Sequence, residues 1–163
     1  MKAIKTKILV LVLSLVMCLV GCTSTPKEIV YEMNGNAEAV ITRIQEEAGE
    51  GLGMVFPVSK VEIDTIYPEL VEADVVDLAG LAPARQGATE IIVVQAEPGQ
   101  TEKIITAMEA HKANQLQIFE QYMTEEMPKI ENTAIVQKGD YIYYVAADNQ
   151  EQVIAIIESF FNK

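Results

Sequence analysis

The 163-residue chain has few of the side chains that build most metal and catalytic sites: two cysteines, one histidine and no tryptophan. A zinc site needs several Cys or His ligands, whereas His111 is the only histidine. Nucleophilic or acid-base catalysis most often uses a histidine beside a nucleophile. We therefore predict no metal ion and no cofactor, and we expect His111 to be structural or to face the solvent.

Long hydrophobic runs are also absent, with one exception at the N-terminus. From Ile8 to Val20 only Ser14 is polar, and Lys2, Lys5 and Lys7 precede this run. The run has 13 residues, whereas a transmembrane helix needs about 20. A basic start followed by a short apolar segment is typical of an export signal.

The end of this segment, Leu19-Val20-Gly21-Cys22, resembles the bacterial lipobox. In that motif Leu19, Val20 and Gly21 would be recognised by the signal peptidase, and the thiol of Cys22 would be lipidated. The resemblance implies a signal peptide over residues 1–21, a lipidated tether over 22–33 and one domain over 34–163. It also implies an anchor on the extracytoplasmic face of the cytoplasmic membrane, because two acyl chains hold a protein firmly in a bilayer.

Cleavage before Cys22 would leave a mature chain without disulfides and with little positive charge. Cys18 would be lost with the signal, and Cys22 would be acylated, so no disulfide could form. The cleavage also removes three lysines and no acid, which leaves 24 acidic against nine basic residues, a formal charge of −15. Such a surface repels phosphate backbones, so nucleic acid is excluded as a partner. The charge suits solubility beside an anionic envelope; docking of a cationic partner or of calcium is the alternative.

Apolar spacing and turn residues predict helices and strands in alternating groups. Residues 52–70 read as a loop with one helical turn near 60–66, and residues 79–89 read as an irregular link. The predicted elements are a helix from Asn36 to Ala48, strands over 71–78 and 90–96, a helix over 101–123, a hairpin of strands 134–137 and 141–146, and a last helix capped by Asp148 with Glu151. This order predicts a single α+β domain with one antiparallel sheet of about four strands, built from two hairpins, and three main helices packed on it.

The segment Gln115–Gln152 carries a family resemblance. It has a long helix that ends in an aromatic and acidic stretch, a Lys-Gly turn between two strands, and an acid-capped final helix. These features are similar to those of small lipoproteins of Gram-positive bacteria that carry the domain of unknown function numbered 4358. The resemblance extends over Asn34 to Phe161 and implies a lipoprotein of unassigned activity, with no functional residues to transfer.

Two groups of side chains are candidates for a site. Tyr141 and Tyr143 share a face of their strand and could line a groove, and Leu81 lies in an apolar segment, 78–84, that would bind a partner if exposed. Glu72, Asp74 and Asp77 form the densest acidic cluster, which we interpret as a solvated strand face because it lacks the glycine of a calcium loop.

Together these patterns predict a membrane-anchored extracytoplasmic lipoprotein that is a binding or accessory module rather than an enzyme. Its partner would be a peptide, an envelope protein or a small ligand. Two alternatives stay open: a carboxylate-dependent hydrolase of cell-wall material, and a weak calcium-binding surface protein.

Overall fold

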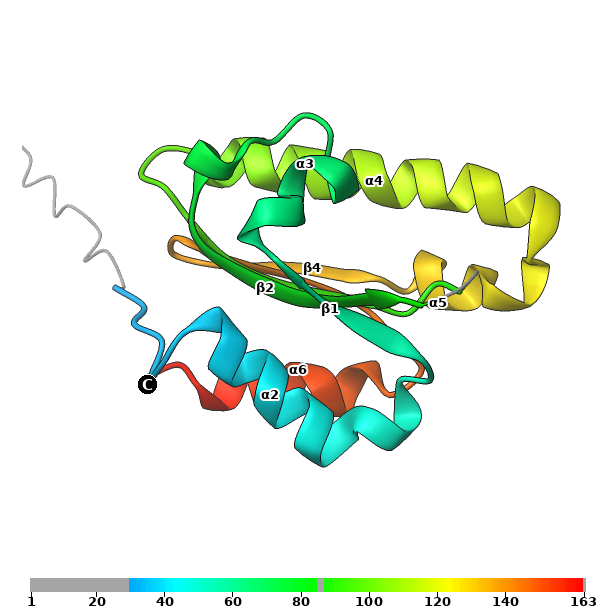
Figure 1. The fold of residues 1–163 in the computed structure, drawn as a ribbon, viewed down its shortest axis with the longest axis horizontal. Coiled ribbons are helices and arrows are strands. Elements are labelled where there is room, and N and C mark those ends of the chain that lie inside the picture. Colours follow the sequence, from blue (N-terminus) through cyan, green and yellow to red (C-terminus); the bar gives the residue numbers. More distant parts are fainter. Residues whose placement is uncertain (1–29, 85–86, 163) are drawn as a thin grey trace, which may run out of the picture.

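Helices lie on both sides of one β-sheet in the structure, a computed structural model that describes residues 30–84 and 87–162 (Figure 1). Short 3₁₀ turns occur at Gly49–Gly51, Lys60–Glu62, Glu72–Asp74 and Thr124–Glu126. The other elements are α2 (Ala37–Ala48), β1 (Val55–Ser59), α3 (Ile63–Ile66), β2 (Val75–Pro83), β3 (Glu90–Ala96), α4 (Thr101–Tyr122), α5 (Met127–Glu131), β4 (Ala134–Lys138), β5 (Tyr141–Ala146) and α6 (Gln150–Ser159).

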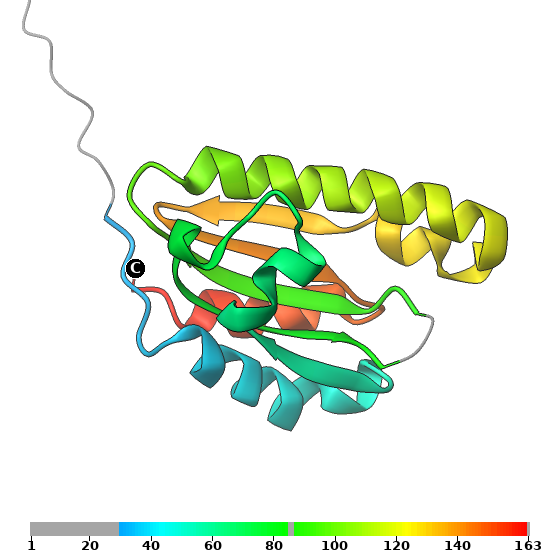
Figure 2. The same ribbon diagram turned by 45° about the horizontal axis from the view of Figure 1, so that its top comes forward.

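The sheet of the described part has five strands in the order β1-β2-β3-β5-β4, and every pair is antiparallel (Figure 2). β4 and β5 form a hairpin whose turn contains Gly139, with φ at +58°, a conformation that glycine adopts without steric cost. The predicted α+β class, the single antiparallel sheet and both predicted hairpins are confirmed.

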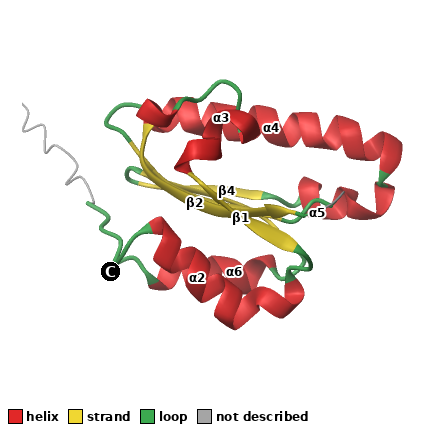
Figure 3. Ribbon diagram, in the orientation of Figure 1, coloured by secondary structure: helices red, strands yellow, loops and turns green. Residues whose placement is uncertain are grey.

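The two faces of the sheet carry separate cores, because successive side chains along a strand point to opposite sides (Figure 3). α2 and α6 cover one face and bury Leu81, Ile91, Val93, Tyr143 and Val145. On the opposite face, α3 and α4 cover a second set, which comprises Leu78, Ile92, Val94, Ile142 and Tyr144. The domain is therefore a three-layer sandwich with the sheet in the middle.

The N-termini of α2 and α6 differ in their capping. Asn36 caps α2 as predicted, since its Oδ1 accepts a hydrogen bond from the Ala39 N–H at 2.9 Å. The prediction for α6 is wrong: its N-cap is Asn149, and no side chain caps it. Asp148 instead forms an ion pair with Lys129 at 3.1 Å, so its carboxylate ties α6 to α5.

The predicted boundaries before β3 also need correction. Residues 55–59 form β1, an edge strand, whereas we predicted a loop there. Pro57 is tolerated in β1 because an edge strand has backbone groups that need no sheet partner. Strand β2 begins at Val75 and runs to Pro83, whereas we predicted a strand over 71–78 and an irregular link from residue 79.

Gly80 lies in the middle of β2, although we predicted that it belongs to an irregular link. Close packing of the sheet at this position explains the glycine. It pairs with Val58 on one side and with Ile92 on the other. A Cβ at this position would lie 2.4 Å from Ile92 Cδ1 and 2.5 Å from the carbonyl oxygen of Ile91. A backbone oxygen cannot move away cheaply, so only glycine fits.

We predict that Gly80→Ala lowers the free energy of unfolding by about 1–3 kcal/mol, the usual cost of overpacking a core. Gly49→Ala is the matched control, because no atom lies within 4 Å of the added Cβ and its φ of −58° suits alanine. Urea unfolding of the two purified variants measures the difference. Equal stability of the two variants would contradict the packing argument.

Candidate functional site

A groove of about 450 Å³ opens beside α4, where α3 and the following loop approach the ends of β2 and β3. We call it the His111 groove. It is lined by Thr65, Ile66, Pro68, Glu69, Ala82, Pro83, Glu90, Ala110, His111, Asn114 and Gln115. Its size lies within the range of small-ligand sites.

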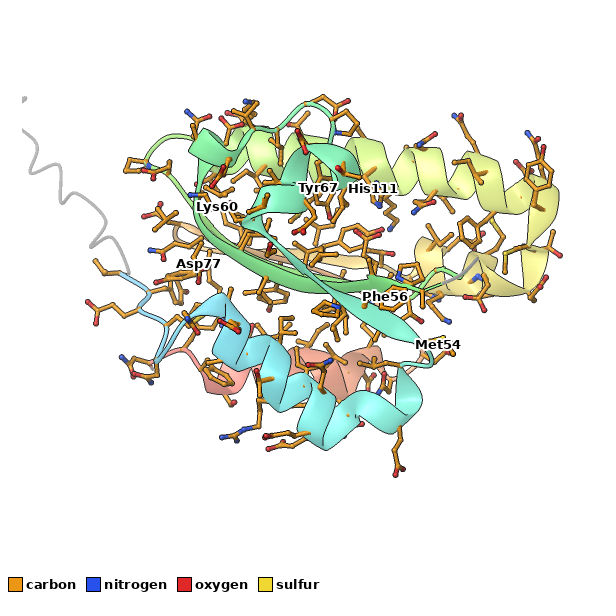
Figure 4. The ribbon with its side chains drawn as sticks, viewed as in Figure 1. Met54, Phe56, Lys60, Tyr67, Asp77 and His111 are labelled. Carbon is orange, nitrogen blue, oxygen red and sulfur yellow. The ribbon has the colours of Figure 1, made fainter. Side chains whose placement is uncertain are left out.

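One wall of the groove is built around the carboxylate of Glu90, the first residue of β3. Glu90 is only 4% exposed, although carboxylates are seldom buried without partners. Tyr67, the residue that follows α3, donates a hydrogen bond from its hydroxyl to Oε1 of Glu90 at 3.2 Å. Oε2 of Glu90 lies 2.8 Å from Nε2 of His111 on α4. The carboxylate thus joins three separate elements, and Figure 4 shows Tyr67 and His111 beside each other between α3 and α4.

The partner of Nε2 fixes the tautomer of neutral His111. A carboxylate only accepts, so Nε2 carries the hydrogen and Nδ1 is the acceptor. No residue that the structure describes hydrogen-bonds to Nδ1. Nδ1 is also not among the buried side-chain polar atoms that lack a partner within residues 30–84 and 87–162. The ring is thus held through Nε2, and in the neutral form of His111 its Nδ1 is an acceptor without a partner among the described residues.

Two tyrosine rings restrict the imidazole further. The ring centroids of Tyr67 and Tyr144 lie 5.0 Å and 5.9 Å from that of His111, both in edge-on geometry. Burial raises the pKa of Tyr67 well above its usual value, and the negative charge of Glu90 raises it further. The pKa of Tyr144 is also raised, mainly by burial and secondly by the charge of Glu90. Both hydroxyls thus stay protonated beside the carboxylate far into the alkaline range.

These raised pKa values predict a loss of stability above about pH 10, where the tyrosines of the unfolded chain ionise. The folded state then binds more protons than the unfolded state, so the free energy of unfolding falls by about 1.4 kcal/mol per pH unit for each such tyrosine. Tyr67→Phe should make this slope shallower by about one proton. Tyr122→Phe, at a hydroxyl exposed on α4, should not. Urea unfolding at successive pH values measures the slopes; the same slope in wild type and Tyr67→Phe would refute the prediction.

A second groove, of about 540 Å³, lies between α5 and the start of α6. The one described cation in its lining, Lys129, is paired with carboxylates. The ammonium of Lys129 is 3.0 Å from Glu126 and 3.1 Å from Asp148, and it also donates to the Thr89 hydroxyl at 3.3 Å. These contacts account for the buried charge of Lys129 through protein partners alone.

Two of the three residues predicted as a binding face are buried. Leu81 is 0% exposed and Tyr143 is 1% exposed, because α2 and α6 cover their side of the sheet. The Tyr143 hydroxyl donates to Glu158 of α6, and Tyr141 packs edge-on against Phe161. The segment 78–84 is mostly part of the interior strand β2 rather than an apolar loop. The exposed apolar side chains nearby are instead Met54 and Phe56, at 68% and 58% (Figure 4).

The predicted acidic cluster is not a solvated strand face. Glu72 and Asp74 lie in a 3₁₀ turn, and Asp74 is buried, where it accepts from the Val71 N–H at 2.7 Å and pairs with Lys103 at 2.6 Å. The hydrogen bond from Lys103, and after it the one from the Val71 N–H, lowers the pKa of Asp74. Asp77 accepts from the Ala37 N–H at the start of α2. In the part of the chain that is described, no group of three or more His, Cys, Asp or Glu side chains could hold a metal ion.

The structure thus gathers residues that the sequence did not bring together. His111 was expected to be structural or solvent-facing, and it lines a groove while hydrogen-bonded to a buried carboxylate. Glu90 and Tyr67 were not singled out. One signal was available for Glu90, since an acid directly before the apolar run Ile91–Val94 of a central strand must find buried partners.

Leu19, Val20, Gly21, Cys18 and Cys22 lie outside the described residues, so the lipidation prediction rests on the sequence. Within residues 30–84 and 87–162, no helix combines the length and the apolar character that crossing a bilayer requires.

The fold and the His111 groove define an α+β domain with one antiparallel sheet and a hydrogen-bonded Tyr-Glu-His wall. The model of the domain of unknown function DUF4358 matches residues 57–147, which is more than half of the chain. The chain therefore belongs to the DUF4358 family. Searches of the curated proteins and of the solved structures each gave no match.

Proposed function

We propose that this chain is a membrane-anchored lipoprotein, tethered through Cys22 to the extracytoplasmic face of the cytoplasmic membrane, whose domain binds a small ligand in the His111 groove. The anchor is supported by the lysine-rich start, the 13-residue apolar run and the lipobox-like Leu19-Val20-Gly21-Cys22. The domain is supported as a binding module by a groove of the right size whose polar groups are held in place before any ligand arrives.

The observation that carries the binding proposal is the position of His111 in the groove with no described hydrogen-bond partner at Nδ1. Its ring is held at Nε2 by Glu90 and lies in edge-on geometry to two tyrosine rings, so it is preorganised and loses little entropy on binding. We favour binding over hydrolysis because both oxygens of Glu90 are already hydrogen-bonded, and no serine or cysteine is among the residues that line the groove.

The anchor predicts incorporation of radiolabelled palmitate into the protein when it is produced in bacteria. Cys22→Ser should abolish the label, because the thiol is the acceptor of the lipid. Cys18→Ser is the matched control and should keep the label, because Cys18 lies within the predicted signal. Gel autoradiography of the three forms measures this. Label on Cys22→Ser, or an unlabelled wild type, would remove the anchor from the proposal.

The binding site predicts localised changes in the NMR spectrum of the ¹⁵N-labelled mature chain when mixtures of small cationic, anionic and neutral compounds are added. At least one compound should shift the amides of Ala110, His111 and Gln115. Ala110→Phe should abolish this binding because the exposed Ala110 lines the groove and a ring would fill it. Ala113→Phe, at an exposed position of α4 outside the groove lining, should preserve it. Hits whose shifts survive Ala110→Phe would place binding elsewhere.

A further inference from the structure

We infer that the ligand of the His111 groove carries a cationic N–H donor, an alkylammonium or guanidinium group such as those of lysine and arginine side chains. This inference rests on the proposed function and names the chemistry of the ligand that the same groove would take. It follows from the polar groups of the wall, from the positions of the lysines on the surrounding elements, and from the apolar residues opposite.

The acidic groups of the groove are acceptors. Glu69 and Glu90 contribute carboxylates, and Glu90 is hydrogen-bonded to the hydroxyl of Tyr67 and to Nε2 of His111. Among the described residues, no lysine or arginine pairs with either carboxylate. A ligand that brings both donors and positive charge matches this wall in hydrogen bonding and in charge.

The described lysines and arginines do not neutralise the groove, since none of them lines it. Both lysines of α4 are engaged elsewhere: Lys103 pairs with Asp74 at 2.6 Å, and Lys112 donates to the carbonyl oxygens of Glu131 and Thr133. Lys60, which precedes α3, donates to the carbonyl oxygen of Val75 at 2.7 Å. Among the described residues, no lysine or arginine supplies the positive charge that would complement this wall, so a cationic ligand would complement it.

The rest of the lining suits the carbon chain of such a ligand. Ile66, Pro68, Ala82 and Pro83 present apolar surface in the same groove. Lysine and arginine side chains combine a methylene stem with a charged head, and they bind with the stem against apolar surface and the head at polar groups. The amides of Asn114 and Gln115, which also line the groove, add further acceptor oxygens.

The test compares four probes of similar length on the ¹⁵N-labelled mature chain: butylammonium, butylguanidinium, butanol and butyrate. At matched millimolar concentrations, which suit such small ligands, the two cations should shift the amides of Ala110, His111 and Gln115, and butanol and butyrate should not. Added sodium chloride should weaken the binding of the cations, because salt screens exposed charges. A response to one cation and not to the other would identify which head group the site prefers, and it would support the inference.

Glu69→Gln should weaken the binding of the cations up to about fivefold, the effect of losing one exposed charge pair. Glu102→Gln is the matched control, because it removes the same charge from an exposed position of α4 outside the groove. Glu90→Gln, which keeps the size of the side chain, should weaken it further, and circular dichroism checks that this variant folds.

The outcomes separate the two proposals. Groove shifts with butanol or butyrate but not with the cations would overturn the cationic ligand and leave the groove a binding site. If neither these four probes nor the compound mixtures shift the groove amides, both proposals fail. Equal weakening by Glu69→Gln and Glu102→Gln would show attraction to the overall negative charge of the domain and would overturn the assignment to the groove.

Discussion

Burial of β3 on both faces and along both edges is the constraint on which the rest of the structure depends. It is hydrogen-bonded to β2 on one side and to β5 on the other. Within its run of β-branched residues, Ile91 and Val93 face α2 and α6, whereas Ile92 and Val94 face α4. Each half of this run therefore supports a different core. Neither helical layer can separate from the sheet without exposing apolar surface of the same strand to water.

The position of Glu90 at the start of this strand explains why an ionisable network exists at all. A carboxylate at the end of a doubly covered strand is removed from water, which is costly unless donors replace the water. Tyr67 and His111 supply these donors, and in doing so they connect α3 and α4 to the sheet. This structural role uses one nitrogen of His111. It leaves Nδ1 without a partner among the described residues, and the proposed binding depends on this second nitrogen.

Local patterns in the sequence were sufficient for much of the fold and for little of the site. The cap at Asn36, the apolar run Ile91–Val94 and the turn at Gly139 each act over a few residues, so α2, β3 and the last hairpin could be predicted. Gly80 was misinterpreted because its cause, close contact with Ile92, comes from pairing across strands. The contacts of Glu90 with Tyr67 and His111 join residues 23 and 21 positions apart. A single sequence contains no spacing that would reveal them.

The residues covered by the family match can be compared with the residues that line the two grooves. Residues 57–147 include the whole lining of the His111 groove, from Thr65 to Gln115. They exclude α2 and α6, which cover the opposite face, and they exclude Asp148 to Gln152, which complete the groove beside Lys129. A site that belongs to the family model must be built from residues within it. Of these two grooves only the His111 groove meets that condition, and its network comes entirely from the α4 side of the sheet.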